Sequence, residues 1–328
     1  MRAGNANTIP LLDVRDLSVE FRTRSGLVRA LERVSFDIRK GETVAIVGES
    51  GSGKSVTAYT VLGINDDAAR VTSGTAMFGG TDLLEADERT LQGLRGREVS
   101  MIFQNPRAAL NPIRPVGRQI ADVLLRHGNV VSRDAPKRAV DLLAQVKIPD
   151  PERRALAYPF ELSGGMCQRI MIALALACTP SLLIADEPTT GLDVTTQAVI
   201  MDLVAELARA NGMATLLITH DLGLAADHCD RIVVMHAGHV VESAPTAELF
   251  RNPRHPYTAR LIGATPRAES RLDELVAIGG NLPDLRAAAL PPCRFSARCD
   301  RHDAACEAPD LPLTLVAERH GVACRHPL

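Results

Sequence analysis

Hydrophobic and polar residues alternate in two stretches near the start of the chain. Residues 17–21 place apolar side chains at every second position, and residues 34–38 repeat this pattern. A period of two is typical of strands that bury one face. We therefore predict an N-terminal antiparallel β layer.

Short, continuously apolar runs follow, each ended by polar residues or glycine. They cover residues 44–47, 100–103, 182–185, 215–218 and 232–235. Strands that are apolar on both faces and separated by helical segments are typical of a buried parallel sheet. The pattern thus predicts an α/β fold with a parallel sheet as its core.

Apolar residues recur with the helical period over residues 116–124 and 200–207. The stretch from about 105 to 179 shows no convincing strand pattern, which predicts a helical insertion between two strands of the sheet. From residue 253 the chain becomes rich in Pro, Arg, Ala and Cys. We therefore expect a domain at 1–252 and a C-terminal extension at 253–328.

Composition narrows the class of protein. Apolar residues make up 46% of the 328 residues, enough for a sizeable core. The 37 basic and 39 acidic residues give a net charge of −2, so no basic field for nucleic acid is expected. The longest run without charge, Ile170 to Ala185, is shorter than the roughly 20 apolar residues of a membrane span. The first ten residues contain no apolar segment typical of a secretory signal, and we expect a cytosolic chain.

Residues 48–55 have the sequence GESGSGKS, which fits the phosphate-loop pattern G-x-x-x-x-G-K-[ST] between a predicted strand and a helical segment. Glycines let backbone N–H groups face the phosphates. Lys54, one of only four lysines in the chain, can reach the β- and γ-phosphates, and the Ser55 hydroxyl can bind Mg²⁺. The predicted nucleotide-binding residues of this loop are Gly48, Glu49, Ser50, Gly51, Ser52, Gly53, Lys54, Ser55 and Val56.

A second candidate segment places two adjacent carboxylates at the end of an apolar strand. Residues 182–185 lead directly into Asp186 and Glu187. Ligands of open α/β sheets bind at the carboxyl ends of the strands. Asp186 suits Mg²⁺, and Glu187 suits a base that orients and polarises the attacking water.

Residues 162–166, with the sequence LSGGM, precede an apolar helix. Ser163 is a candidate N-cap, and Gly164 and Gly165 leave backbone N–H groups uncovered at the positive helix end. This arrangement predicts a second anion site, although an ordinary capped helix start has the same pattern. Gln104 and His220 each follow an apolar run and have no specificity on their own.

Together these segments resemble the ATP-binding subunits of ABC transporters, over about residues 11–250. The matching order is the phosphate loop, Gln104, the LSGGM segment, Asp186-Glu187, the TGLD segment at 190–193 and His220. The resemblance implies a P-loop NTPase core and two ATPase domains that face each other head to tail with ATP between them. The residues it implies at the opposing domain's ATP or surface are Ser163, Gly164, Gly165 and Asp193.

The resemblance also implies catalytic roles. Glu187 would be the catalytic carboxylate, His220 would contact the γ-phosphate, and Lys54 would bind the phosphates. Gln104 would sense Mg²⁺ and link the site to the membrane subunits. The implied Mg²⁺ ligands are Ser55, Gln104 and Asp186.

Finer features resemble the oligopeptide/dipeptide importer branch, over residues 11–326. They are GESGSGKSVTA from residue 48, FQNP from 103, HPYT from 255 and the cysteines of the extension. The branch implies an ATP-hydrolysing subunit that powers uptake of dipeptides or oligopeptides. Nickel or another small solute is an alternative cargo. A soluble ABC ATPase outside transport is the other class, disfavoured because the chain has one cassette and no sustained heptads.

The same branch implies partners and a location. The partners are two integral-membrane permease subunits, a second ABC ATPase subunit that is a distinct chain or a second copy, and indirectly an external solute-binding protein. The chain would be a peripheral subunit at the cytoplasmic face of the inner membrane, and no nucleic acid is implied. Two positions depart from the family pattern. Cys167 replaces the usual Arg near the expected interface, and the adenine-stacking aromatic is not obvious, because Phe21 also fits a core position.

Four cysteines lie in the extension, at Cys293, Cys299, Cys306 and Cys324, separated by 5, 6 and 17 residues. They form no C-x-x-C pair, which counts against the usual zinc ribbons, and a cytosolic location counts against disulfides. Four thiolates also suit a [4Fe–4S] cluster, which the resemblance to the importer branch implies. Zinc and unligated thiols or disulfides remain the alternatives. A structural role is expected, because the extension has few apolar residues for a core of its own. The scattered Cys178 and Cys229 are expected to be inert core residues.

Overall fold

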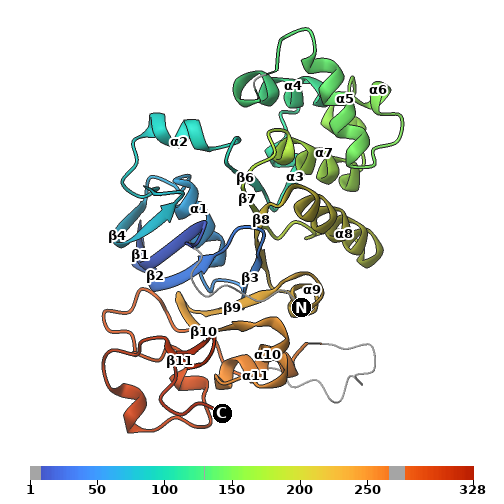
Figure 1. Cartoon of the computed structure of the whole chain (residues 1–328). Helices are drawn as coiled ribbons and strands as arrows, with labels where there is room; N and C mark the ends of the chain where they lie inside the picture. Colours follow the sequence, from blue (N-terminus) through green and yellow to red (C-terminus); the bar gives the residue numbers. More distant parts are fainter. Residues whose placement is uncertain (1–8, 129, 266–277) are drawn as a thin grey trace. The chain divides into compact units, whose positions relative to one another are not determined.

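The computed structural model of the chain describes residues 9–128, 130–265 and 278–328. Most of the N-terminal segment on which the expectation about a secretory signal rests lies outside these residues. The chain divides into two compact units, each described here by itself (Figure 1). The first unit comprises residues 1–39, 43–85 and 217–328, and the second comprises residues 40–42 and 86–216.

An antiparallel sheet forms one layer of the first unit, with its strands in the order β2, β1, β4, β5. Val14 of β1 lies opposite Phe36 of β2 and Ala76 of β4, and all three side chains are buried. The predicted N-terminal β layer is thereby confirmed. The strands are β1 (Leu12–Thr23), β2 (Gly26–Ile38), β4 (Ala69–Phe78) and β5 (Thr81–Asp82).

A second ladder of strands forms the core of the first unit. Strand β3 (Thr43–Val47) is parallel to β9 (Arg231–His236), and β9 is followed by the antiparallel β10 (His239–Pro245). The C-terminal extension continues this ladder, because β12 (His320–Val322) pairs with β10 and β11 (Thr314–Ala317) pairs with β12. The extension is therefore hydrogen-bonded into the first unit.

The helices of the first unit are short. They are α1 (Lys54–Leu62), α9 (Leu222–His228), α10 (Thr246–Arg251) and α11 (Pro256–Gly263), with the 3₁₀ turns η3 (Ser296–Arg298) and η4 (Ala304–Glu307). Strand β8 (Ala214–Thr219) runs across the boundary between the two units in the sequence. The predicted strands at 44–47, 215–218 and 232–235 are all present.

Two parallel strands and most of the long helices make up the second unit. Strand β6 (Val99–Ile102) pairs with β7 (Leu182–Asp186), and all their side chains are buried, as their continuous apolar character predicts. Between them, the described residues of 105–179 contain helices and no strand, which confirms the helical insertion. The helices are α2 (Glu88–Leu94), α3 (Pro106–Ala109), α4 (Val116–His127), α5 (Ala135–Gln145), α6 (Pro151–Arg154), η1 (Pro159–Glu161), α7 (Gly164–Leu176) and α8 (Val194–Asn211).

Candidate functional site

The phosphate loop of the first unit connects β3 to α1, the strand-to-helix context that its motif requires. Two of its glycines are obligatory. Gly48 has φ of +154°, and a Cβ there would lie 2.1 Å from the carbonyl oxygen of Met235. Gly53 has φ of +100° and would place a Cβ 2.6 Å from Leu31. The backbone of the loop is therefore packed directly against its neighbours.

Lys54 begins α1, and its side chain is buried within the loop. Its ammonium donates hydrogen bonds to the carbonyl oxygens of Gly48, at 2.9 Å, and Glu49, at 3.0 Å. A buried ammonium needs such acceptors, because burial without partners would cost several kcal/mol. The loop thus holds a cation at the position that the sequence assigns to the nucleotide's phosphates.

Two residues of the extension hold Glu49, and neither contact was predicted from the sequence. The backbone N–H of Glu49 donates to the hydroxyl oxygen of Tyr257, and Arg298 donates two hydrogen bonds to the Glu49 carboxylate. Tyr257 belongs to the HPYT segment that the sequence singled out without a structural role. In this segment His255 caps α11 by accepting a hydrogen bond from the N–H of Tyr257.

The carboxylate pair ends β7 in the second unit. Asp186 is 1% exposed. Glu187 follows it with a backbone φ of +45°, a value that residues other than glycine rarely adopt. The Glu187 carboxylate accepts hydrogen bonds from the amide of Gln104, at 2.8 Å, and from the hydroxyl of Thr190, at 2.9 Å. The structure therefore brings the predicted Gln104 and Glu187 together.

The LSGGM segment behaves as a capped helix start in the second unit. The Ser163 hydroxyl accepts a hydrogen bond from the N–H of Met166 at 3.3 Å. A Cβ at Gly164 would meet nothing within 4 Å, and one at Gly165 would only touch Thr196 at 3.5 Å. These glycines are therefore not required by packing within this unit, which fits a backbone surface kept bare for a ligand.

Cys167, at the position where the family usually has Arg, lies in the first part of α7. Its side chain is completely buried, and its sulfur contacts the carbonyl oxygen of Pro159 at 3.4 Å. Burial raises the pKa of the thiol, so it stays protonated at neutral pH. Cys167 is therefore a packing residue of α7. Cys229 is also buried, with a pKa raised to about 12, and Cys178 is half-buried.

The remaining predicted residues lie at element ends. Asp193 caps α8 by accepting hydrogen bonds from the N–H and hydroxyl of Thr196, which lower its pKa. His220 directly follows β8 and is exposed. Phe21 is half-buried in β1, opposite Val28 and Ala69, so the structure gives it a sheet position.

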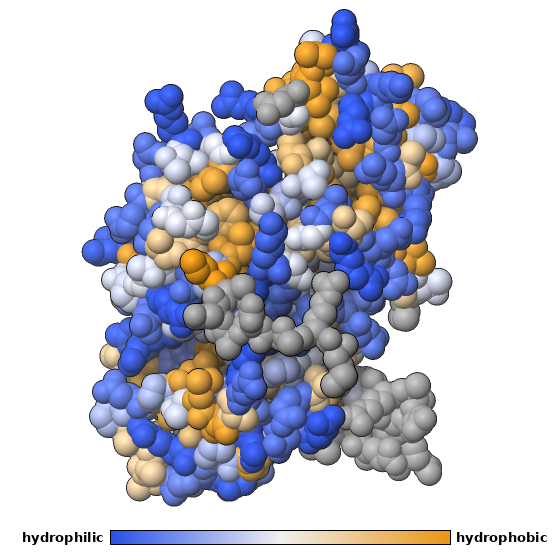
Figure 2. Space-filling model, viewed as in Figure 1, coloured by the Kyte–Doolittle hydropathy of each residue, from blue (hydrophilic) through white to orange (hydrophobic). Residues whose placement is uncertain are grey.

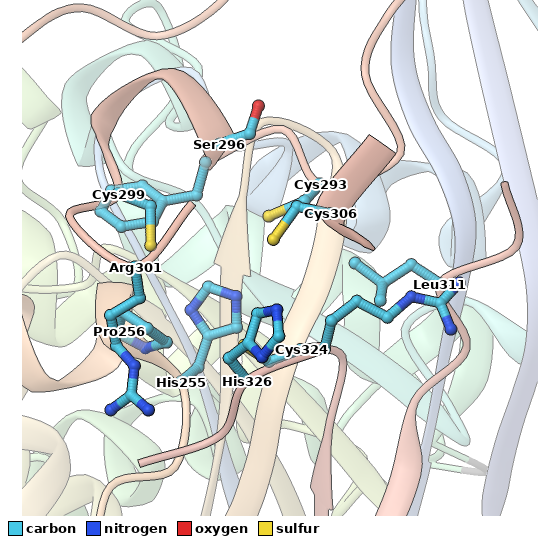
Figure 3. A pocket seen from close by; sticks show the side chains of 12 residues that line it. His255, Pro256, Cys293, Ser296, Cys299, Arg301, Cys306, Leu311, Cys324 and His326 are labelled. Carbon is cyan, nitrogen blue, oxygen red and sulfur yellow. The ribbon is translucent and has the colours of Figure 1, made fainter. Parts of the chain in front are cut away.

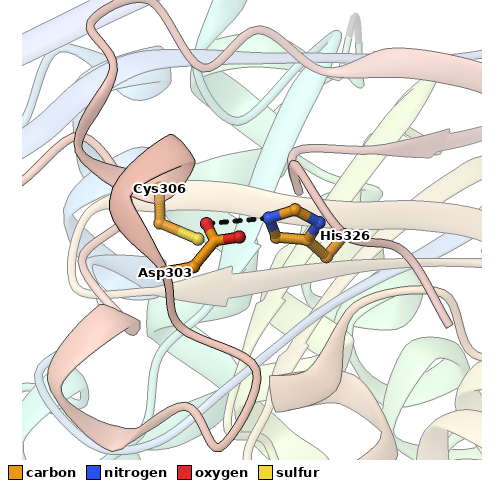
Figure 4. A group of neighbouring side chains, drawn as sticks. All are labelled: Asp303, Cys306 and His326. Carbon is orange, nitrogen blue, oxygen red and sulfur yellow. Dashed lines mark hydrogen bonds and ion pairs between the residues drawn. The ribbon is translucent and has the colours of Figure 1, made fainter.

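All four cysteines of the extension line one pocket, together with His255 and His326 (Figure 3). Burial, together with the neighbouring Cys324, Cys306 and Cys299, raises the pKa of Cys293 to about 11. Within the described residues, the side chains whose potential metal-ligand atoms all lie within 4.8 Å of one another are not the four cysteines. They are Asp303, Cys306 and His326 (Figure 4). In this group His326 is hydrogen-bonded to Asp303 at 2.9 Å.

Comparison with known proteins decides the family. Residues 31–190 match the family model described as ABC transporter. The dipeptide transport ATP-binding protein DppD of Bacillus subtilis is 45% identical over 315 residues, covering 96% of this chain and 94% of that protein. The chain belongs to the ABC transporter family. Residues 241–306 match the model for the C-terminal region of oligopeptide/dipeptide transporters, which places this ABC protein in that branch.

Further comparisons agree. A probable peptide ABC transporter ATP-binding protein of Sinorhizobium fredii, y4tR, is 46% identical and covers 96% of this chain and 94% of its own length. Among solved structures, a dimeric ATP-binding cassette, MJ0796, bound to ADP and phosphate, has a TM-score of 0.64 at 27% identity, over 72% of this chain and 98% of that one. The cbiO1 subunit of a Clostridium perfringens ABC transporter has a TM-score of 0.62 at 26% identity, over 74% and 91%. The ABC cassette fold expected from the sequence is thus confirmed.

None of the helices in the described ranges combines the length and the apolar character that crossing a membrane requires.

Proposed function

We propose that this ABC ATPase powers the uptake of dipeptides or oligopeptides as a peripheral subunit at the cytoplasmic face of the inner membrane. The observation that carries the proposal is the match of residues 241–306 to the C-terminal region of oligopeptide/dipeptide transporters. The 45% identity to a dipeptide transport protein over nearly the whole chain supports it. The functional division is a nucleotide-binding domain at 1–252 and an extension at 253–328.

The proposed chemistry assigns one task to each group. Lys54, which lies buried in its loop, donates to the β- and γ-phosphate oxygens, and the backbone N–H groups of the loop bind the remaining phosphate charge. Glu187 accepts a proton from water while the water oxygen bonds to the γ-phosphorus and the bond to ADP breaks. Hydrogen bonds from Gln104 and Thr190 fix the direction of its carboxylate. His220 contacts the γ-phosphate.

Mg²⁺ suits the residues proposed for it, because hydroxyl, amide and carboxylate oxygens are its preferred ligands. Asp186 is nearly inaccessible at the end of β7, and a buried carboxylate is stable only when a cation or hydrogen-bond donors compensate its charge. When bound, the ion would neutralise negative charge on the transferred phosphoryl group. The ligands would be Ser55, Gln104 and Asp186.

The proposed partners are two membrane permeases, a second ATPase subunit and, indirectly, an external solute-binding protein. In the second unit, seven large apolar side chains are exposed among the described residues, and Figure 2 shows hydrophobic residues reaching the surface of the molecule among hydrophilic ones. They are Phe103, Ile113, Leu125, Val131, Leu156, Phe160 and Val199. We assign the permease contact to this helical part, since exposed apolar groups mark interaction surfaces. Ser163, Gly165 and Asp193 would face the second ATPase.

We propose further that Cys293, Cys299, Cys306 and Cys324 hold a [4Fe–4S] cluster, since all four line one pocket. On a single zinc ion, thiolates at about 2.3 Å from the metal would lie roughly 3.8 Å from one another. In the described residues the compact group includes Cys306 alone among the cysteines. A larger cluster therefore fits the four-cysteine pocket better than one zinc ion. It would cross-link the extension.

Metal analysis separates these possibilities. Full-length protein purified without oxygen should be brown and contain iron and acid-labile sulfide, both lost in Cys299→Ser. His326→Ala should keep the iron, because His326 belongs to the alternative zinc group. Colourless protein with one equivalent of zinc that is lost in His326→Ala would contradict the cluster.

The transport proposal is tested on the complex isolated from membranes with this chain as bait. Its ATP hydrolysis should rise when the solute-binding protein is loaded with dipeptides or longer peptides, with a Glu187→Gln complex as the blank. A rise with nickel and not with peptide would select the other cargo. Hydrolysis without any membrane partner or response to solute would contradict an importer.

A further inference from the structure

The C-terminal extension reaches the phosphate loop through an ion pair in which the arginine is buried and the carboxylate is partly exposed. Arg298, at the end of η3, donates hydrogen bonds to both carboxylate oxygens of Glu49, at 2.8 and 2.9 Å. The Arg298 side chain is 4% exposed and that of Glu49 is 29% exposed. A two-pronged contact of this kind is among the stronger charge-assisted hydrogen bonds and fixes orientation as well as distance.

The extension itself holds Arg298 in this position. Its Nε donates to the carbonyl oxygen of Gly279 at 2.9 Å, and its guanidinium carbon lies 5.6 Å from the ring centre of Phe295. The neighbouring residue, Cys299, lines the four-cysteine pocket. Folding of the extension and placement of the guanidinium are therefore linked.

Glu49 is held a second time, through its backbone. Its N–H donates to the hydroxyl of Tyr257 at 3.1 Å, and Tyr257 is fully buried between His236 and Phe295, with ring centres at 4.5 and 5.3 Å. Side chain and backbone of the same loop residue are thus both fixed by the extension or by the helix leading into it. Glu49 is the first residue after Gly48, so this contact sets the entrance of the loop.

The charge of Glu49 makes this contact consequential. Hydrogen bonding to Arg298 holds the pKa of the Glu49 carboxyl below its usual range, so the loop carries a negative charge at neutral pH. A carboxylate repels the phosphates that the loop binds unless an adjacent cation neutralises it. Arg298 is that cation.

We propose that Arg298 is a positioning residue for ATP binding: it orients and neutralises Glu49, so that the affinity of the phosphate loop depends on a folded C-terminal extension. The inference rests on the assignment of residues 48–55 to ATP. It gives the extension a task inside the ATPase unit, in which the HPYT tyrosine takes part.

A charge-rescue experiment on the full-length chain tests the inference. The readout is the dissociation constant of a fluorescent ATP analogue, with melting temperatures measured in parallel. Arg298→Gln keeps a long polar side chain but leaves Glu49 uncompensated, and should weaken ATP binding about tenfold, as expected for loss of a charged hydrogen-bonded pair. Glu49→Gln should bind ATP more tightly than Arg298→Gln does, because it removes the repelling carboxylate and leaves the Arg298 cation beside the loop.

The double variant Arg298→Gln/Glu49→Gln provides the decisive comparison. It should bind ATP more tightly than Arg298→Gln alone, because the uncompensated carboxylate is gone. If Arg298 only stabilised the fold, the double variant would bind no better than the single one, and that result would overturn the inference. Wild-type affinity in Arg298→Gln would overturn it as well. Should Arg298→Gln fail to fold, Arg298→Lys keeps the charge without the fork and should lie between wild type and the tenfold loss.

The chain offers a matched control. Arg294, from the same segment and equally buried, pairs with Glu32 on β2 instead of with the phosphate loop. Glu32→Gln should lower the melting temperature without changing ATP affinity, and an affinity loss equal to that of Arg298→Gln would overturn the specific role of the Arg298–Glu49 pair. Lys54→Ala tests the assignment of residues 48–55 to ATP separately from the role of Arg298. Unchanged ATP binding in this variant would refute that assignment.

Discussion

The amide of Gln104 donates a hydrogen bond of 2.8 Å to the carboxylate of Glu187, joining the second residue after β6 to the first residue after β7. The two residues are 83 positions apart in the sequence. The parallel pairing of β6 with β7 brings their carboxyl ends to the same edge, so the contact follows from the topology. Gln104 is expected to link the site to the membrane subunits. A movement of its loop would therefore change the hydrogen bond that orients the proposed catalytic carboxylate.

Glu187→Gln is expected to abolish hydrolysis while leaving ATP binding intact. The amide has the shape of the carboxylate but cannot accept a proton from water, and loss of a general base typically costs at least about a hundredfold in rate. The variant should therefore accumulate an ATP-bound closed dimer, detectable by size-exclusion chromatography. Asp202→Asn, an exposed carboxylate on α8, is the matched control and should hydrolyse ATP normally. Unchanged turnover in Glu187→Gln would show that another group is the base.

Lys54→Ala is expected to weaken nucleotide binding and to remove ATP hydrolysis. A charged hydrogen bond contributes roughly 1.5–3 kcal/mol, so the dissociation constant of ATP should rise about ten- to a hundredfold. Lys147→Ala is the matched control, because Lys147 is an exposed lysine paired with Glu206. Titration with a fluorescent ATP analogue measures both variants. A Lys54→Ala protein that binds ATP as the wild type does would remove the phosphate loop from the mechanism.

Two glycines of the phosphate loop should respond differently to the same substitution. Gly48→Ala would place a Cβ 2.1 Å from a backbone oxygen, which no side-chain movement can relieve, so both stability and ATP binding should be lost. Gly51 has φ of +80°, and its nearest neighbour lies at 3.5 Å. Gly51→Ala should therefore cost only about 1–2 kcal/mol of backbone strain. Thermal melting and ATP titration compare the two, and equal losses would refute the steric explanation.

The elements that sequence patterns predicted correctly are those with a local signal. The strands at 44–47 and 182–185 are continuous apolar runs, and the phosphate loop is a short motif between a strand and a helix. Gln104 and Glu187 were each recognised after an apolar run, although the hydrogen bond between them was not predicted. Such features depend on neighbouring residues, so a single sequence reveals them.

The contacts that the sequence did not reveal are long-range. Tyr257 and Arg298 lie 208 and 249 positions from Glu49, and nothing around either residue indicates a phosphate loop as its partner. The sequence also did not reveal that Cys167, beside the LSGGM segment, lies on a helical face that is turned into the core. Only the packing of α7 decides that orientation. The HPYT motif did mark Tyr257 as unusual, and this was the one available signal.

The buried His236 predicts a loss of stability in mildly acidic solution. Its side chain is inaccessible, and burial together with the charge of Arg298 lowers its pKa to about 4. The unfolded chain takes up this proton near pH 6.5 and the folded chain only near pH 4. The contribution of His236 to the free energy of unfolding is therefore fully present above pH 6.5. It decreases as the pH falls towards 4, by up to about 1.4 kcal/mol per pH unit.

Urea unfolding of wild type and His236→Phe between pH 7.5 and 5 measures this contribution. The variant keeps the aromatic contact with Tyr257 and Phe295 but binds no proton, so its stability should fall less steeply with decreasing pH, by about 1 kcal/mol per pH unit. Glu49 does not interfere in this window, because its lowered pKa makes its own contribution disappear only in more acidic solution. Parallel pH dependences of the two proteins would show that folding does not lower the pKa of His236. The packing of His236 against Tyr257 and Phe295 would then have to accommodate a charged imidazolium.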